Sequence, residues 1–245
     1  MTGSRGVIGT ILSRELRSSY DVVGIDIKRG SRGSRRIDAT DLKAHSREFQ
    51  QKHVVIDLAA NADPSISWHQ VLTNNVPATL NALEASRQAG VERVVFASSN
   101  HVTGMYERDP PYSAIAAGRY DGLDAGAVPH ITAGHALRPD SPYAVGKALG
   151  EAAGRYYSDE FGLSVICLRL GTVTSSDRPR TPRHFATLLT HRDLVSLVRC
   201  SIEAPGDVRF AVFYGVSANT WRFWDLEPAR QILGYEPQDN AEHWR

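Results

Sequence analysis

Cysteine, long apolar runs and a surplus of one charge are all scarce in this chain of 245 residues. Its two cysteines, Cys167 and Cys200, allow no disulfide framework, and both lie in apolar runs. Reduced, buried thiols in a cytoplasmic protein are therefore expected. No run approaches ~18 apolar residues, so no membrane span is expected. The first residues, MTGSRGVIG, do not show the charged region followed by an apolar stretch that a signal peptide has.

The net charge is only +1, from 28 Lys and Arg against 27 Asp and Glu. Without a basic surplus, the sequence predicts neither a nucleic-acid partner nor membrane attachment. Hydrophobic residues make up 42% and charged residues 22%, as is usual for a globular protein. His130 and His135 have no carboxylate or cysteine neighbours at ligand spacing, so no metal is expected.

Short apolar runs rich in β-branched residues alternate with helical patterns along the chain. Continuous apolar runs suit strands that are covered on both faces, as in a parallel sheet. Two of the helical patterns begin at proline, which is favoured in a first turn. The expected fold is therefore α/β, with a doubly wound parallel sheet. The expected strands are 22–25, 54–58, 94–97 and 165–170, and the expected helices are 8–18, 77–90 and 142–161.

The start of the chain places Gly3, Gly6 and Gly9 at three-residue spacing before a predicted helix. Glycines allow the backbone to approach a pyrophosphate, and the free N–H groups at a helix start bind an anion. Asp26 follows at the end of the next predicted strand, where a carboxylate can bind both ribose hydroxyls of NAD. The pattern predicts a Rossmann-like domain that binds NAD.

Two features qualify this prediction. Only Met1 and Thr2 precede Gly3, although a dinucleotide-binding sheet needs a strand there, so the first strand is expected to be missing or truncated. Its absence would weaken stability and cofactor binding. Basic residues that follow Asp26 also leave NADP open, because they could hold its 2′-phosphate. They are Lys28, Arg29, Arg32, Arg35 and Arg36.

A serine and a tyrosine–lysine pair supply candidate chemistry. Ser99 follows the strand 94–97, at a carboxyl end where α/β proteins bind ligands. Tyr143 and Lys147 are four residues apart in a predicted helix and so share one face. A nearby ammonium lowers the pKa of tyrosine from about 10 and makes it a usable base. The pair alone is often a surface contact, but its order after the glycine loop, Asp26 and Ser99 predicts an oxidoreductase.

These residues resemble the extended short-chain dehydrogenase/reductases, the NAD-dependent epimerase/dehydratase family. The resemblance rests on TGSRGVIG at 2–9, Asp26, Asp38, DLAANADP at 57–64, Asn75, FASSN at 96–100 and SPYAVGK at 141–147. Later segments are most similar to uronate dehydrogenases and related sugar dehydrogenases. These segments are FASSNH at 96–101, LRLGTVT at 168–174, HRDLVSL at 191–197, YGVSANT at 214–220 and LGYEPQDNAEHWR at 233–245.

The resemblance implies NAD-linked oxidation of a sugar at its anomeric carbon to a lactone. Tyr143 would be the base, Lys147 its partner and a cofactor ligand, and Ser99 would assist. The residues expected to bind NAD are Gly3, Gly6, Val7, Ile8, Gly9, Asp26, Asp38, Ala59, Asn75, Lys147 and Leu170. The residues expected to contact the sugar are Asp63, Ser99, Asn100, His101, Thr172 and Arg183.

The expected substrate is a small and anionic sugar. Arg178, Arg180, Arg183 and His184 crowd into a polar insert at 174–184, and arginine forks bind carboxylate or phosphate. Arg183 matches the arginine that binds the substrate carboxylate in the uronate enzymes. A solvated basic loop is the other interpretation of the cluster. Asp63 falls where those enzymes carry a serine, and a carboxylate there should disfavour an anion. A hexuronate, an aldose and a sugar phosphate all stay open.

The expected domains are an NAD-binding domain over 1–170, which includes the catalytic helix, and a small interleaved substrate lobe over 171–245. Residues 105–141 have no clear period and are expected to form a long lid or substrate loop. The alternative function is an NDP-sugar epimerase or dehydratase, which would need a larger C-terminal lobe. A cofactor-sensing regulator on the same fold would not need Tyr143 and Lys147. The sequence leaves a homo-oligomer open.

Overall fold

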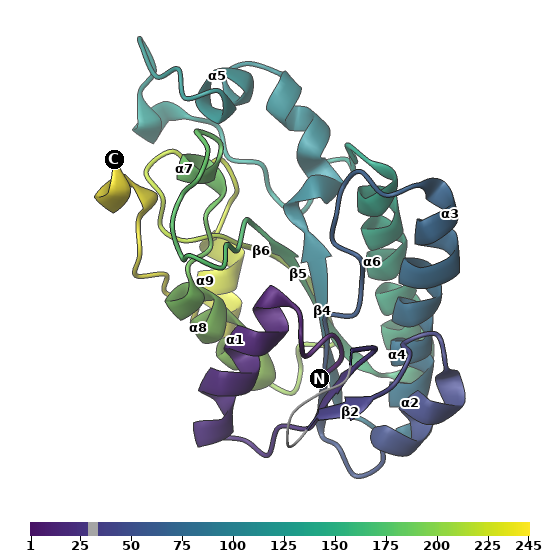
Figure 1. The fold of residues 1–245 in the computed structure, drawn as a ribbon. Helices are drawn as coiled ribbons and strands as arrows, with labels where there is room; N and C mark the ends of the chain where they lie inside the picture. The colour runs from purple at the N-terminus through teal and green to yellow at the C-terminus, as the bar shows by residue number, and fades with distance from the viewer. Residues whose placement is uncertain (29–33) are drawn as a thin grey trace.

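The computed structural model describes residues 1–28 and 34–245, so Arg29 and Arg32 of the basic run lie outside the described residues. Over this part the chain alternates helices and strands, as the sequence predicts (Figure 1). The strands are β1 (Gly24–Asp26), β2 (Ser34–Arg36), β3 (Val54–Asp57), β4 (Arg93–Ser99), β5 (Ser164–Leu170) and β6 (Phe210–Gly215). The α-helices are α1 (Val7–Glu15), α2 (Leu42–Glu48), α3 (Trp68–Gln70), α4 (Val76–Ala89), α5 (Tyr112–Ala116), α6 (Pro142–Phe161), α7 (His184–Thr187), α8 (His191–Ile202) and α9 (Glu227–Leu233). Shorter helical turns are η1 (Leu16–Ser18), η2 (Val71–Asn75), η3 (Asn100–Arg108), η4 (Ala125–Ala127) and η5 (Ala241–Trp244).

The strands within the described residues form a pair, β1 and β2, and a four-stranded sheet in the order β3-β4-β5-β6. Every pairing is parallel. The register sets Ser99 beside Leu170 at the carboxyl ends of β4 and β5. All residues of β5 are buried, as expected for a strand that is covered on both faces. The predicted doubly wound, Rossmann-like fold is confirmed, although β2 and β6 were not predicted.

Helices cover both faces of the sheet and bury two separate cores (Figure 1). On one face α1, α8 and α9 pack against the strands, and Leu12, Leu197 and Phe213 are among the buried contacts. On the other face α2, α4 and α6 do so, with Leu83, Phe96 and Val165 among the buried side chains. This two-sided burial explains why the central strands are continuous apolar runs.

Met1 and Thr2 lie between β1 and the larger sheet. The amino group of Met1 donates to the Val23 carbonyl at 2.8 Å, and its carbonyl accepts from the Ile25 N–H at 2.9 Å. The Thr2 N–H donates to the Ile56 carbonyl at 3.0 Å. Met1 also lines a cavity of about 520 Å³, together with apolar side chains such as Val22 and Phe49 and polar ones such as Asp21 and Glu48. Met1 and Thr2 therefore join β1 to β3 through backbone hydrogen bonds.

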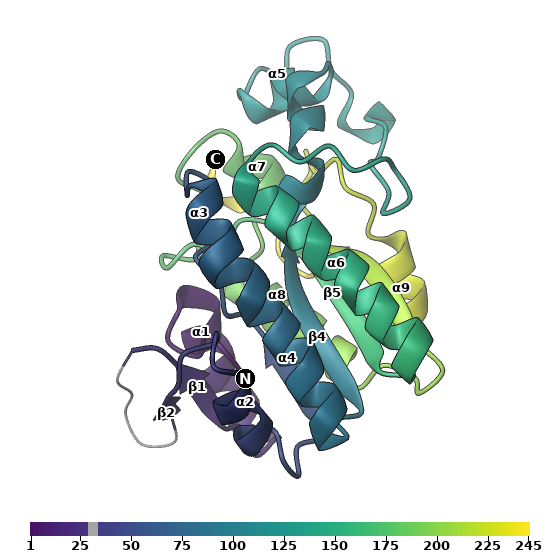
Figure 2. The same cartoon turned by 90° about the vertical axis from the view of Figure 1, so that its right-hand side faces the viewer.

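The insert at 105–141 has short helices of its own, although its sequence shows no clear period, and its role as a lid or substrate loop stays a prediction. It contains α5 and η4, and it buries Ile115, Val128 and Ile131 against Tyr214 and Trp224. Short helical turns with few apolar residues leave no periodic pattern, which is why the sequence did not reveal them. The insert lies beyond the carboxyl end of β4 (Figures 1 and 2).

The long helix α6 begins at Pro142 and ends at Phe161, as predicted. The Ser141 side chain accepts the N–H of Ala144, and Gly162 ends the helix with a φ of 70°. This start places Tyr143 in the first turn and Lys147 one turn later. In Figure 2 the helix runs alongside α4 over one face of the sheet, and its first turn lies near the carboxyl ends of the strands.

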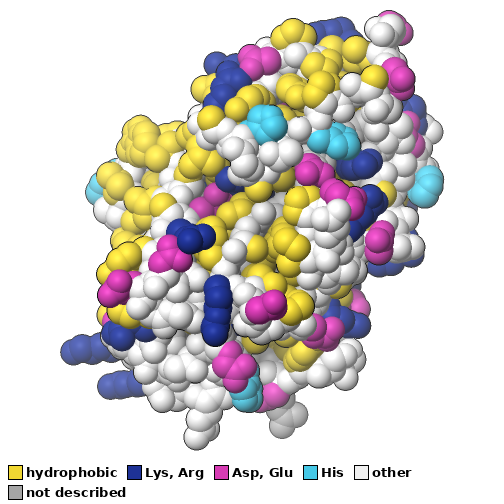
Figure 3. All heavy atoms as spheres, turned by 180° about the vertical axis from the view of Figure 1, so that it is seen from behind, with side chains coloured by type: hydrophobic (Ala, Val, Ile, Leu, Met, Phe, Trp, Pro, Cys, Tyr) yellow, Lys and Arg dark blue, Asp and Glu magenta, His cyan; other side chains and the backbone are white. Residues whose placement is uncertain are grey.

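Basic and acidic side chains are interspersed on the face drawn in Figure 3, which fits the small net charge. Among the described helices, none is long and apolar enough to cross a membrane. Strand β6, which comes from the predicted substrate lobe, pairs with β5 in the main sheet. The division of the chain at residue 170 stays a prediction.

Candidate active site

Ser99, Tyr143 and Lys147 come together at the carboxyl end of β4, and all three are buried. Helix α6 packs on β4 and presents both of its residues toward that strand. The ammonium of Lys147 lies 4.7 Å from the centre of the Phe96 ring and 5.9 Å from the centre of the Tyr143 ring. The predicted spacing therefore places an acid–base group and a cation on one helix face above a serine.

Burial and neighbouring groups tune this trio. Burial raises the pKa of Tyr143, and its hydrogen bond with Ser99 offsets part of that rise. The lowering that the sequence predicted from Lys147 is not found, because the effect of burial is larger. Burial lowers the pKa of Lys147 to about 8, against the negative charge of Asp57, which favours the ammonium. A proton can therefore leave this lysine at a pH close to the physiological range.

Asp57 is a residue whose role the sequence analysis missed, although it lies within a matched motif. It is buried at the end of β3, and its carboxylate accepts the Thr2 hydroxyl at 2.6 Å. Burial raises its pKa, while Thr2 and Lys147 favour the charged form. Asp57 thus bonds Thr2, next to the glycine loop, and its charge and that of Lys147 favour each other's ionised form. The sequence feature that could have revealed this role is a carboxylate at the end of a buried strand.

A cavity of about 470 Å³ lies between the glycine loop and the ends of β1 and β3. Six of the predicted NAD residues line it: Gly3, Gly6, Asp26, Asp38, Ala59 and Asn75. The backbone of the loop comes very close to β3, because a Cβ on Gly3 would lie 2.8 Å from Leu58. Gly3 also has a φ of 59°, which favours glycine. These residues fit the adenosine and phosphate part of a dinucleotide.

The polar groups of this cavity are already oriented. Asp26 accepts the N–H groups of Arg5 and Lys28, each at 2.9 Å, and so joins the loop to β1. The side chain of Asn75 bonds the backbone of Asn61 in both directions, at 2.9 and 3.0 Å. His45 also lines the cavity, and it is a buried residue that the sequence analysis missed.

The other predicted cofactor residues occupy different places. Val7 is exposed in the first turn of α1, and Ile8 packs on the core beneath it. A Cβ on Gly9 would lie 2.2 Å from the Gly3 carbonyl oxygen, so this glycine serves the packing of loop on helix. Leu170 is buried at the end of β5, next to Ser99. Their contacts with NAD stay predictions.

On the substrate side, His101 and Asp140 form a close pair, with 2.6 Å between Nδ1 and Oδ2. The His101 ring meets the Tyr143 ring edge-on, with 6.3 Å between their centres. Asn100 is buried, and its side-chain nitrogen has no hydrogen-bond partner among the described residues. Asp140 is another functional candidate that the sequence analysis missed. The sequence feature that could have identified Asp140 is its position directly before Ser141 and the start of α6.

Arg183 and Thr172 also come together, with 3.4 Å between Nη1 and Oγ1. The guanidinium of Arg183 is already bound by Glu107, at 2.6 and 2.7 Å. Glu107 belongs to the segment that follows Ser99, and the sequence analysis missed it. Asp63 is exposed and accepts from Ser65, with no hydrogen bond to the other predicted sugar contacts within the described ranges.

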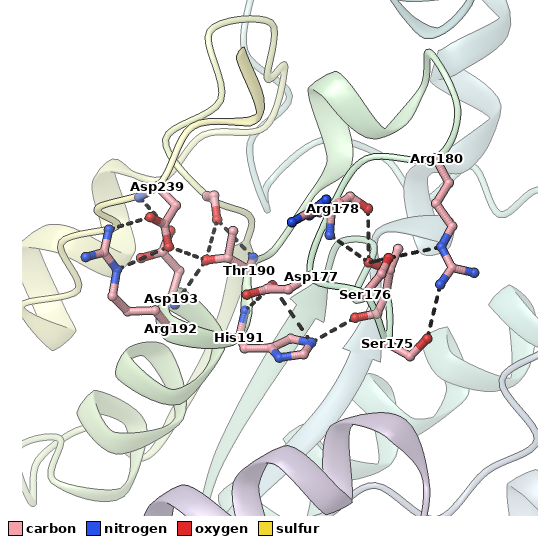
Figure 4. Close-up of polar contacts among 12 residues, drawn as sticks. Ser175, Ser176, Asp177, Arg178, Arg180, Thr190, His191, Arg192, Asp193 and Asp239 are labelled. Carbon is pink, nitrogen blue, oxygen red and sulfur yellow. Dashed lines mark hydrogen bonds and ion pairs between the residues drawn. The ribbon is translucent and has the colours of Figure 1, made fainter. Parts of the chain in front are cut away.

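The predicted arginine cluster is not a single clamp. Figure 4 shows Arg180 turned toward Ser175 and Ser176, which it bonds at 3.2 and 3.1 Å. The rest of this insert folds against the start of α8, where Asp177 accepts the N–H of His191 at 2.7 Å. Local partners thus hold Arg180, and only Arg183 of the cluster has a hydrogen bond to Thr172 within the described residues.

The fold and the site together define a class of protein, and a family profile identifies it. The profile described as "NAD dependent epimerase/dehydratase family" matches residues 1–207, so the chain belongs to that family. The match includes the glycine loop, Ser99, Tyr143 and Lys147.

Individual relatives are sugar dehydrogenases by name. An NAD-dependent glucose-6-phosphate dehydrogenase of Haloferax volcanii is 37% identical over 209 residues, covering 83% of this chain and 75% of that protein. An L-arabinose 1-dehydrogenase (NAD(P)(+)) of the same organism is 34% identical over 252 residues, covering 98% and 96%. The crystal structure of uronate dehydrogenase from Agrobacterium tumefaciens superposes with a TM-score of 0.84 at 27% identity, covering 100% of this chain and 85% of that one.

Proposed function

We propose that this protein is an NAD-dependent dehydrogenase that oxidises a small sugar at its anomeric carbon to a lactone, with Tyr143 as the base. The observation that carries the proposal is the buried group of Ser99, Tyr143 and Lys147, which Asp57 and Thr2 connect to the dinucleotide cavity. The names of the relatives support the cofactor and the class of reaction.

The chemistry follows from the placement of these side chains. NAD, when bound, supplies the acceptor for the hydride that leaves C1 of the sugar. The Tyr143 phenolate takes the proton of the C1 hydroxyl, so that a carbonyl forms at C1 as the C1–H bond breaks. The Ser99 hydroxyl hydrogen-bonds the reacting oxygen and orients it. The Lys147 ammonium stabilises the phenolate and contributes a donor toward the nicotinamide ribose.

The charges at the ribose end of the cavity favour NAD over NADP. The Asp26 carboxylate lines this cavity and would repel a 2′-phosphate. Arg35 of the predicted basic run bonds Glu48 at 2.5 Å, and Arg36 donates to the Ile27 carbonyl at 3.2 Å. These contacts engage two of the cations that could have held that phosphate.

An NDP-sugar epimerase has less support as the function. After β5, the chain contributes β6 to the sheet and α8 and α9 to the layer that covers it. Little of the C-terminal part is then left to bind a nucleotide attached to the sugar. The cytoplasmic location and a homo-oligomer stay predictions.

The test is a screen for NADH formation across glucose, L-arabinose, glucuronate and glucose 6-phosphate. Methyl glycosides of the same sugars serve as controls, because they have no free C1 hydroxyl. We expect NADH with at least one free sugar, none with its glycoside, and a lactone as product. Conversion of an NDP-sugar to its epimer without net NADH would contradict the proposal, and so would NADH from the glycosides.

A further inference from the structure

We infer that Glu107 sets the charge of the substrate: by neutralising Arg183, it selects a sugar that carries no acidic group. This inference rests on the proposed function and names the substrate class of that same site. It departs from the sequence prediction of an anionic sugar, which rested on Arg183.

The contact between the two residues is a two-point ion pair. The Nε and Nη2 of Arg183 donate to the two carboxylate oxygens of Glu107 at 2.6 and 2.7 Å. This is the arrangement in which an arginine would hold the carboxylate of a sugar acid. The Glu107 side chain is only 12% exposed and that of Arg183 26%, so both are largely shielded from water. The face of the guanidinium that would bind a uronate is therefore already occupied.

The backbone keeps Glu107 in this position. It lies in η3, which starts from the carboxyl end of β4 immediately after Ser99. The N–H of Met105 donates to the Arg138 carbonyl at 2.9 Å, and the N–H of Arg138 donates to Val102 at 3.1 Å. These bonds fix the backbone that leads into Glu107 and so keep its Cα within reach of Arg183.

The remaining charges near Arg183 do not restore a positive site. Arg183 is one of several groups that affect the pKa of Asp140. Burial raises this pKa, but the hydrogen bonds with His101 and Ser141 and the charges of His101 and Arg183 lower it below its usual value. Asp140 is therefore ionised at neutral pH, beside the substrate residue His101. With Glu107 paired to the guanidinium and the Asp140 carboxylate within range of its charge, an incoming carboxylate or phosphate meets no net positive charge at Arg183.

An anionic sugar would have to displace Glu107 to reach Arg183. The exchange replaces one carboxylate by another and leaves Glu107 shielded from water without its partner. A neutral sugar needs no such exchange. Its own hydroxyls can bond Nη1 of Arg183, which makes no bond to Glu107, and the Thr172 hydroxyl, which Nη1 reaches only at 3.4 Å. Selection thus works by rejecting the charged competitor.

Glu107→Gln tests this inference on the full-length protein with NAD. The measured quantity is kcat/KM for glucose and for glucuronate, which differ only at C6, and for the galactose and galacturonate pair. In the wild type we expect the neutral sugar of each pair to be preferred. In Glu107→Gln we expect the ratio of kcat/KM for uronate over aldose to rise at least about tenfold, because Arg183 regains its unpaired charge.

Two controls isolate the effect. Glu160→Gln removes an exposed carboxylate from the far end of α6 and should leave the ratio unchanged. Adding Arg183→Ala to Glu107→Gln should abolish the gain for uronates, which a general change of surface charge would not do. If the wild type prefers uronates and Glu107→Gln weakens them, or if the ratio does not move, the inference is wrong. If no sugar yields NADH with any variant, the proposed function itself fails.

Discussion

The two halves of the sheet are held in very different ways. The catalytic half, β3–β6 with α4 and α6, is a continuous parallel sheet with strands of up to seven residues, and both of its faces are covered. The cofactor half, Met1–Thr2 with β1 and β2, meets that sheet through the Thr2 N–H, which donates to Ile56, and through the core that Ile25 shares with Val94. A cavity of about 520 Å³ lies alongside that junction. The comparison teaches that continuous strand pairing holds the catalytic half, whereas the half with the dinucleotide cavity relies more on side-chain packing.

A polar network beneath the active site accounts for the rigidity of the catalytic half. Glu151, one turn beyond Lys147, binds Arg169 at 2.9 and 2.8 Å and accepts the Ser98 hydroxyl at 2.5 Å. Arg169 also donates to the Tyr214 hydroxyl at 3.1 Å. The network ties α6 to three neighbouring strands, β4, β5 and β6, below their carboxyl ends. In this buried setting each partner depends on the others, so it fixes the helix that carries Tyr143.

The largest effect is expected from Tyr143→Phe, which should impair the reaction in the catalytic half and leave NAD binding by the cofactor half intact. Tyr143→Phe should lower kcat by about 10³-fold or more, roughly 4 kcal/mol, because the base is lost. NAD binding, measured by calorimetry, should change little. Tyr156→Phe is the matched control, since this tyrosine lies on the same helix and is 57% exposed. Activity near that of the wild type in Tyr143→Phe would refute the mechanism.

Removing the buried carboxylate tests the rigidity of the catalytic half. Glu151→Gln leaves the Arg169 guanidinium buried with only part of its partners, which should cost about 3 kcal/mol. For a chain of this size that corresponds to a fall of roughly 10 °C in Tm.

The control for this change is Asp159→Asn, further along α6. Asp159 forms a pair with Arg155 in which both side chains are more than half exposed. That exposed pair should contribute less than ~1 kcal/mol. Equal losses of thermal stability in the two variants would show that the buried network does not brace this half.

The amino group of Met1 gives the cofactor half a pH dependence of its own. Burial lowers the pKa of this group from 8.0 to about 6. The unfolded chain therefore binds more protons between pH 6 and 8, and stability should rise with pH across that window, by at most about 2 kcal/mol. Urea unfolding at several pH values measures it.

Burial also lowers the pKa of His45, so this histidine adds a pH dependence of its own. A chain acetylated at its N-terminus isolates the amine, because acetylation removes the charge and leaves the histidines unchanged. The acetylated chain should show a smaller rise in stability between pH 6 and 8. Identical slopes in both forms would mean that the buried amine does not destabilise the junction.

Sequence reasoning found most of what local patterns encode. Continuous apolar runs identified the inner strands, and Pro142 marked the start of α6, so Tyr143 and Lys147 were placed correctly on one face. The glycine spacing and Asp26 located the dinucleotide cavity.

The rest depends on contacts between distant segments, which no local pattern records. Glu107 lies 76 positions from Arg183 and in an insert without periodicity, so nothing nearby marked it as a partner. Arg178, Arg180 and Arg183 looked equivalent as neighbours in sequence, but their partners in space differ. Asp57 and Asp140 acquire their roles only when β3 and the start of α6 meet at the same edge of the sheet.

The most direct test of the account is deuterium transfer from the sugar. The protein is supplied with NAD and with a sugar that it oxidises, deuterated only at C1, and the NADH is analysed by mass spectrometry. We expect NADH that carries the deuterium, with no transfer in Tyr143→Phe. Unlabelled NADH would show that the hydride leaves another carbon and would contradict oxidation at the anomeric centre.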